Sequence, residues 1–448
     1  MPKGRHLATS AVKEYARPSR DGYVPLSVPC IRGNEWKYIR DCLDTGWVSS
    51  VGSYVDRFEN EFAAYVDGPA AAAVVNGTSA LHLGLRAVGC QPGDAVLVPD
   101  LTFVASATAA IFCGARPRFV DVDPDTGCLT PTILEQYLDT ETETRDGVTY
   151  VRDTGERIRA AVVVHLLGHP APIGPLVDML HQRGIAVVED AAQALGTTWD
   201  GQHVGLFGDV GCFSFNGNKT ITTGGGGMLV SGDAELVQRA RHWARQSRVP
   251  GIWYEHDELG HNYRLTNIQA AMGVAQLEDI DERLRVKRET AEFYSSELKE
   301  MRHARLLMPP QGGQSSWWIF GAVLDLDSVG ANLERVIAFA ESRGVQTSPL
   351  FTPLHQVTSM RAFAGDTDQR FTGAEHLATK TLLLPSSANI TPEDRAQVVE
   401  MLKALPSKLL PASAGGTTSA RVGSRETCRP LRKVRANRAP EEPQSSLL

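Results

Sequence analysis

Short apolar runs alternate with segments of helical period along the first half of the chain. The Val-rich runs predict strands and the segments between them predict helices. The expected strands are 95–99, 118–122, 161–166 and 186–189, and the expected helices are 105–113, 132–138 and 173–183. Nearly continuous apolar strands separated by helices indicate an α/β fold with a mainly parallel sheet covered on both faces. Ligands of such folds bind at the carboxyl ends of the strands, where Asp190 falls.

Two segments depart from this alternation. Residues 141–159 are rich in charge, and we expect a surface hairpin there with its turn at Asp153-Thr-Gly155. Residues 267–299 form a long helical pattern, which is typical of a connector between a large domain and a smaller C-terminal one.

The chain has 448 residues, which is long enough for two domains. We expect an N-terminal extension (1–24), a large domain that binds the principal ligand (25–250) and a smaller α+β domain (251–405). Residues 406–448 are rich in Pro, Ser, Ala, Gly and Arg with little periodicity, and they predict a disordered tail.

Composition narrows the class of protein without naming a function. The chain is 42% hydrophobic and 22% charged, with a formal net charge of −7, so a nucleic-acid partner is not expected. No apolar stretch approaches the ~20 residues of a membrane span, and residues 1–20 lack an apolar signal core. Seven scattered cysteines without a CxxC pair favour neither a metal site nor a disulfide framework. A protein of the reducing cytoplasm is expected.

The segment around Lys219 carries the most specific chemical signal. Residues 212–228 predict an apolar strand, a polar turn with one lysine, a Gly run and a second strand. Asp190 ends a buried-type strand about thirty residues earlier. Pyridoxal phosphate needs such a pair, because an aspartate pairs with its pyridinium nitrogen and a lysine forms the Schiff base. Taken alone, Asp190 is equally a helix cap and Lys219 a solvated loop lysine, and only the set favours the cofactor.

Other residues complete a candidate cofactor site. The Gly-Thr-Ser sequence at 77–79 precedes a helical segment, and a helix N-terminus suits a phosphate, although the same sequence is an ordinary N-cap. Ser214 offers another hydroxyl, and Gln193 can bond to the O3′ oxygen of the ring. Phe103 could stack on the ring or lie in the core.

Competing motifs fail on spacing. Asn218 separates Gly217 from Lys219, so the segment is no P-loop. The glycines at 224–227 open a strand and not a helix, which excludes a dinucleotide fingerprint. His165 and His169 follow a strand and enclose no Glu, so a zinc site is not expected.

Taken together and in this order, the motifs resemble the DegT/DnrJ/EryC1/StrS family of sugar aminotransferases from about residue 25 to 405. The resemblance is carried by GWVSS at 46–50, FENEF at 58–62, GTSA at 77–80, EDAAQ at 189–193, FSF at 213–215 with Lys219, NYRLTNIQA at 262–270 and PLH at 353–355. It implies a fold similar to that of aspartate aminotransferase (fold type I), with pyridoxal 5′-phosphate as cofactor. It also implies transfer of an amino group from glutamate to a keto carbon of a nucleotide-linked sugar.

The resemblance assigns roles position by position. The implied cofactor contacts are Thr78, Ser79 and Ser214 at the phosphate, Asp190 at the pyridine nitrogen, Gln193 at O3′, Phe103 on the ring face, Lys219 as the Schiff-base and proton-transfer lysine, and Asn262 at the phosphate of the neighbouring subunit. A homodimer with shared sites follows from the last of these. The candidate substrate contacts are Trp47, Ser49, Arg264 and His355. Gly225 is a departure, because many members have Glu there.

Within the family, the segments 24–29, 33–39, 45–52 and 153–155 look most like the LegC-type branch. That branch implies UDP-4-keto-6-deoxy-N-acetylglucosamine as substrate, aminated at C4 for bacillosamine or legionaminic acid synthesis. Perosamine synthases, which use a GDP-linked keto sugar, share the core motifs and are the alternative. A non-catalytic regulator that retains the fold is a third and less favoured interpretation.

Overall fold

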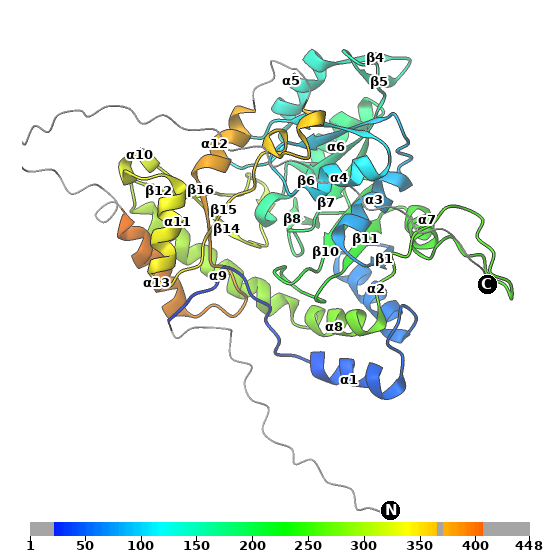
Figure 1. Ribbon diagram of the computed structural model, residues 1–448, viewed down its shortest axis with the longest axis horizontal. Helices are drawn as coiled ribbons and strands as arrows, with labels where there is room; N and C mark the ends of the chain where they lie inside the picture. Colours follow the sequence, from blue (N-terminus) through cyan, green and yellow to red (C-terminus); the bar gives the residue numbers. More distant parts are fainter. Residues whose placement is uncertain (1–21, 365–370, 406–448) are drawn as a thin grey trace, which may run out of the picture. The chain divides into compact units, whose positions relative to one another are not determined.

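A seven-stranded sheet organises the computed structural model, which describes residues 22–364 and 371–405 (Figure 1). The strands lie in the order β1 (Ala70–Val74), β11 (Gly227–Ser231), β10 (Val210–Ser214), β7 (Ala186–Asp190), β6 (Ile158–Val164), β2 (Ala95–Pro99) and β3 (Arg116–Val120). All neighbouring pairs are parallel except the two that β11 makes, with β1 and with β10. The predicted α/β fold with a mainly parallel sheet is confirmed.

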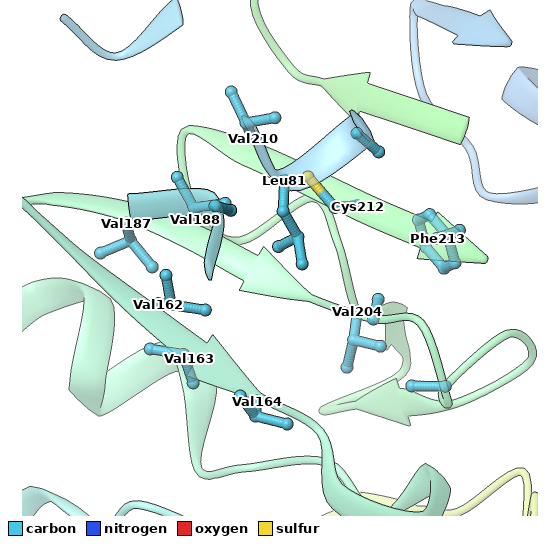
Figure 2. Packing of buried hydrophobic residues seen from close by; sticks show 14 of the residues in the cluster. Leu81, Val162, Val163, Val164, Val187, Val188, Val204, Val210, Cys212 and Phe213 are labelled. Carbon is cyan, nitrogen blue, oxygen red and sulfur yellow. The ribbon is translucent and has the colours of Figure 1, made fainter. Parts of the chain in front are cut away.

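The central strands are buried on both faces, which explains their unbroken apolar sequences. Val162 and Val163 of β6 and Val187 and Val188 of β7 are each 0% exposed. Figure 2 shows these side chains near Leu81, which comes from helix α3 and belongs to the same buried cluster. β-Branched residues favour such pleated, enclosed positions.

Helices surround the sheet, and three of them correspond to the predicted helices 105–113, 132–138 and 173–183. The surrounding helices are α1 (Glu35–Thr45), α2 (Ser53–Tyr65), α3 (Gly77–Ala87), α4 (Ala105–Phe112), α5 (Pro131–Glu141), α6 (Ile173–Gln182) and α7 (Ala234–Ala244). The expected strand 161–166 is shifted, because β6 ends at Val164 and the chain turns into a 3₁₀ segment, η1 (Leu166–Gly168). Leu167 there has a φ of 58°, which no strand can accommodate.

The charged insertion forms a hairpin, but its turn was predicted at the wrong place. Strands β4 (Thr142–Arg145) and β5 (Val148–Val151) pair antiparallel around Asp146-Gly147. Both turn residues have positive φ, 52° and 77°, as the tightest hairpin turns require. The turn at Asp153-Thr-Gly155 instead follows β5, where the Gly155 N–H donates to the Val151 carbonyl at 2.8 Å.

The long pattern 267–299 is two helices and not one, α8 (Asn267–Leu277) and α9 (Ile280–Lys299). The break falls at two acidic residues that bond to the N-terminal segment. Glu278 accepts hydrogen bonds from Asn34 and from Tyr38, each at 2.7 Å. Asp279 pairs with Arg32 at 2.6 Å. These long-range contacts could not be read from helical periodicity.

A second, antiparallel sheet lies in the C-terminal part, in the order β12 (Ala304–Leu306), β14 (Phe320–Leu324), β16 (Thr381–Leu384) and β15 (Ser348–Pro349). It shares its own buried cluster with α9, α11 (Leu333–Ser342) and α13 (Pro392–Lys403). Helix α9 contributes to both clusters, with Leu284 in the first and Tyr294 in the second. The domain limits proposed at 24, 250 and 405 stay a prediction, and the expected tail 406–448 lies outside the described residues.

The remaining elements are β8 (Thr198–Trp199), β9 (Gln202–His203) and β13 (Gly313–Gln314), which form a three-stranded sheet, together with α10 (Leu326–Val329), η2 (Leu354–Gln356), η3 (Arg361–Phe363) and α12 (Thr372–Lys380). Within 22–364 and 371–405, no helix has both the length and the apolar character that crossing a bilayer requires.

The hairpin turn offers a test of backbone conformation without a packing change. Gly147 has a φ of 77° and no atom within 4 Å of an added Cβ. Gly147→Ala should therefore lower the free energy of unfolding by about 1 kcal/mol through backbone strain alone. Urea unfolding measures this, with Gly232→Ala as the control, since Gly232 has equal space and no positive φ. Equal effects of the two substitutions would contradict the assigned turn.

Candidate active site

Lys219 lies in the loop that joins β10 and β11, as predicted. The loop is closed by a hydrogen bond from the Phe215 N–H to the Gly226 carbonyl at 2.8 Å. The Lys219 Nζ lies 3.8 Å from the centre of the Trp318 ring, and the Trp318 Nε1–H donates to the Asn218 carbonyl at 2.7 Å. Trp318 precedes β14, about one hundred residues along the chain, so its contact with this loop could not be predicted from local sequence pattern.

The surroundings of Lys219 favour its neutral amine. The residue is half-buried, yet protein atoms crowd its ammonium group and displace water. This desolvation lowers the pKa of Lys219 to about 8, while attraction to the Asp190 carboxylate acts in the opposite direction. About a tenth of the amine is thus unprotonated at pH 7, far more than for an ordinary lysine, and this is the form that attacks a carbonyl.

Asp190 ends β7 at the carboxyl edge of the sheet, and its carboxylate is buried and anchored. The Ser106 hydroxyl donates to Asp190 Oδ2 at 2.7 Å, and the Ala192 N–H donates to Oδ1 at 3.2 Å. Ser106 in turn lies 3.2 Å from the Thr102 hydroxyl. Ser106 was not predicted, because a serine on an Ala-rich helix carries no signal of its own.

Glu189, one residue earlier, has a structural role. Its carboxylate accepts backbone N–H groups from the loop 205–208 and lies 2.9 Å from His165 Nε2. His165 Nδ1 accepts the Ala171 N–H at 3.1 Å, so Nε2 carries the ring proton and donates it to Glu189. His165 is therefore part of the scaffold beneath Asp190.

His169, which the sequence analysis considered together with His165, is also buried and hydrogen-bonded in the interior. His169 Nδ1 lies 2.8 Å from the Ser315 hydroxyl, and Nε2 lies 3.2 Å from the Leu307 carbonyl. Burial lowers the pKa of His169 to about 4, so the ring is neutral at physiological pH.

Gln193 is held in one orientation by the backbone. Its Oε1 accepts the Leu167 N–H at 2.7 Å, which leaves the Nε2 amide group as a hydrogen-bond donor. The side chain follows Asp190 by three residues and is 6% exposed. The strained Leu167 backbone thus fixes which end of the amide a ligand oxygen would meet.

Helix α3 begins directly after β1, and the free N–H groups of such a helix end suit an anion. Asn76 is the N-cap, since its Oδ1 accepts the Ser79 N–H at 2.8 Å. A Cβ added to Gly77 would lie 2.8 Å from Ser214 Cβ, so only glycine lets this turn approach Ser214. The cap and the phosphate interpretations of Thr78 and Ser79 are therefore compatible, because the cap occupies one N–H and the helix end offers others.

Phe103 is not a core residue. Its side chain is 55% exposed and meets the edge of Phe351 at a centroid distance of 6.0 Å. More than half of the side-chain surface is therefore available to a ligand. Gly225, the departure from the family pattern, accepts a hydrogen bond from Gln269 through its carbonyl at 2.6 Å.

Of the candidate substrate contacts, Trp47 and Ser49 lie near Asn267, and Arg264 lies at the end of β1. Trp47 is 56% exposed, and the Trp47 and Ser49 carbonyls accept hydrogen bonds from the Asn267 side chain and N–H. Arg264 forms a β-bridge with Val74 at the end of β1, and Asn262, the predicted contact to the phosphate of the neighbouring subunit, is exposed.

His355 differs, because both ring nitrogens face carboxylates. Nδ1 lies 2.6 Å from Asp100, and Nε2 lies 3.2 Å from Glu375. A substrate contact through this ring would compete with those partners, and its role stays a prediction.

These features match the requirements of pyridoxal phosphate. A buried carboxylate and an amine of lowered pKa lie at one edge of the sheet, and a helix N-terminus approaches Ser214. An amide donor fixed at Gln193 completes the set. The residues present thus fit the cofactor.

Comparison with known proteins gives the same result. The model of the DegT/DnrJ/EryC1/StrS aminotransferase family matches residues 29–403. EpsN of Bacillus subtilis (strain 168), named for pyridoxal phosphate-dependent amino transfer, is 37% identical over 84% of this chain and 94% of its own. GDP-perosamine synthase of Vibrio cholerae is 37% identical over 80% of this chain and 89% of its own.

Among solved structures, the aminotransferase TlmJ from Streptoalloteichus hindustanus superposes with a TM-score of 0.77 at 30% identity, covering 86% of this chain and 99% of that one. The chain belongs to the DegT/DnrJ/EryC1/StrS aminotransferase family and is a pyridoxal phosphate-dependent aminotransferase.

Proposed function

We propose that the protein transfers an amino group from glutamate to a keto carbon of a nucleotide-linked sugar. The observation that carries the proposal is the Lys219 amine, whose pKa is lowered to about 8 at the same edge of the sheet as the anchored Asp190 carboxylate. The relatives whose names state an activity support the sugar part of the proposal.

We assign the chain's residues the following roles, which their placement supports. When bound, pyridoxal phosphate supplies a carbonyl that exchanges amino groups and a ring that accepts electrons. Asp190 holds the proton on the ring nitrogen, and Gln193 Nε2 donates to the ring oxygen. The free Lys219 amine moves a proton between the substrate carbon and the cofactor carbon.

The remaining contacts surround this centre. Thr78, Ser79 and Ser214 bind the phosphate, Phe103 covers the ring, and Asn262 reaches the phosphate of a second copy in a homodimer. The exposure of Phe103 and of Asn262 supports these two assignments.

For the sugar itself, the relatives favour the alternative that the sequence placed second. GDP-perosamine synthase of Vibrio cholerae shares 37% identity with the chain, so we propose a GDP-linked 4-keto-6-deoxy sugar as the acceptor. The UDP-linked 4-keto-6-deoxy-N-acetylglucosamine suggested by the N-terminal motifs is the second candidate. The joint presence of Asp190, Gln193, Ser214 and Lys219 argues against a non-catalytic role.

Separate incubations with the two keto sugars distinguish these candidates. The protein, loaded with cofactor and supplied with glutamate, should convert GDP-4-keto-6-deoxymannose to its amino sugar, seen by mass spectrometry. Amination of the UDP-linked sugar alone would move the assignment to that substrate. Turnover of neither sugar, with glutamate still converted to 2-oxoglutarate, would contradict both assignments.

Lys219→Ala should lower kcat by about a thousandfold, because it removes the group that moves the proton. Lys299→Ala, an exposed lysine at the end of α9, is the matched control and should leave kcat within about twofold. Steady-state assays with glutamate measure both variants. Near-native turnover of Lys219→Ala would contradict the assignment.

Asp190→Asn should change the titration of Lys219 in a defined direction. The carboxylate stabilises the ammonium, so its loss should move the pKa of Lys219 below about 8. At pH 7 the amine of the cofactor-free variant should therefore be labelled faster by an acylating reagent than in the parent protein. Peptide mass spectrometry across pH measures the shift, and an unchanged or raised pKa would contradict the pairing.

A further inference from the structure

Two adjoining cavities beside β1 are lined by arginines that the reaction described above does not use. Both are lined by α7 and by the segment 245–264, which projects from the β1 side of the sheet (Figure 1), and the smaller one is also lined by α2. Their volumes are about 470 and 730 Å³. Arg241, Arg245 and Arg264 line both cavities, and Arg248 also lines the larger one.

The larger cavity has a strong excess of positive charge. Its walls carry those four arginines and also His242 and His256, while no Asp or Glu is among the described residues that line it. His242 pairs with Asp257 at 2.7 Å. The smaller cavity does contain two carboxylates, Asp56 and Glu59.

One of the arginines is already neutralised. Arg241 pairs with Glu59 at 2.8 Å and donates to the Ala71 carbonyl at 2.6 Å, so it serves to fasten α7 to α2 and β1. Glu59 is one of the two carboxylates that line the smaller cavity. The other is Asp56, which forms no ion pair with a described residue.

The other three arginines lack such partners. Arg264 reaches only the Ser50 carbonyl, at 3.4 Å, and its buried Nε meets no acceptor among the described residues. Arg248 lies over the Tyr254 ring at 4.1 Å. Within residues 22–364 and 371–405, none of Arg245, Arg248 and Arg264 forms an ion pair.

Holding three guanidinium groups together is unfavourable without an anion. Burial lowers the pKa of Arg264, and repulsion from Arg245 and Arg248 lowers it further. Guanidinium groups bind phosphate oxygens through paired hydrogen bonds, and such contacts strengthen where water is excluded. A ligand with two or more negative charges therefore complements this cavity.

The cavity also adjoins the candidate active-site segment. Arg264 forms a bridge with Val74, and the Val75 N–H donates to the Tyr263 carbonyl at 2.8 Å. The chain continues from Val75 into the 77–79 turn at the start of α3. The arginines thus belong to the same segment as the exposed Asn262.

We propose that the larger cavity binds the diphosphate group of the nucleotide-linked substrate, with Arg245, Arg248 and Arg264 pairing with its oxygens. This assignment rests on the proposed function. It gives Arg264 the substrate diphosphate as its partner. It also adds Arg245 and Arg248 to the candidate substrate contacts, although no sequence motif had indicated them. A free nucleoside diphosphate carries the same group and should occupy the same cavity.

Binding to the full-length, cofactor-loaded protein tests the proposal. Calorimetric titration with GDP should show Kd at least about tenfold higher for Arg248→Gln than for the parent. Inorganic pyrophosphate should lose affinity in the same way, and guanosine, which lacks the diphosphate, should not respond to the substitution. Arg239→Gln removes an exposed charge of α7 that lies outside the cavity and is the matched control.

Kinetics separate a binding role from a structural one. Arg248→Gln should raise KM for the keto sugar about tenfold and change KM for glutamate by less than about twofold, while Arg248→Lys should restore part of the loss. Equal GDP affinity in the parent and in Arg248→Gln, or equal rises in both KM values, would overturn the proposal. Diphosphate binding through Arg248 without amination of either sugar would support the anion site and overturn the proposed substrate instead.

Discussion

The parallel register of β6, β7 and β10 is the constraint on which the site depends. Asp190 pairs in register with Val164 on one side and with Cys212 on the other. The strained 3₁₀ turn after β6 and the Lys219 loop after β10 therefore leave the sheet at the same edge as Asp190. A slip of one residue in β7 would turn the carboxylate to the opposite face of the sheet.

Buried polar groups hold this edge in place. Glu189 is fully buried, and its polar carboxyl group is tolerated there because backbone N–H groups and His165 satisfy both its oxygens. Its bonds fix the 205–208 loop against β7, next to Asp190. The side chain one residue before Asp190 thus serves the scaffold, and the alternation of side chains along a strand separates Glu189 from Asp190.

Burial lowers the pKa of both Lys219 and Lys287, but the two amines have different surroundings. Lys287 is 3% exposed, and its pKa is lowered to about 7. Its ammonium group donates hydrogen bonds to the carbonyls of Trp318 and Ser386, at 3.0 and 2.7 Å, and both acceptors belong to the backbone. Lys219 lies on the face of Trp318 instead and keeps its amine available. Lys287 therefore fixes the residue on which Lys219 rests.

The sequence predicted what local pattern determines. The strand at 95–99 was placed to the residue, and Asp190 and Lys219 fell at the strand end and in the loop where the structure has them. Contacts between distant segments could not be predicted, because no periodicity records them. Trp318 beneath Lys219, Ser106 on Asp190 and the helix break at Glu278 all belong to this class.

Borohydride reduction of the cofactor-loaded protein tests the central claim most directly, because it converts the lysine–cofactor linkage into a stable bond. Peptide mass spectrometry then identifies the modified lysine. The account predicts the phosphopyridoxyl mass on the peptide that contains Lys219, and its absence after incubation with excess glutamate before reduction. Modification of Lys287, the other lysine of lowered pKa, with Lys219 unmodified would contradict the account.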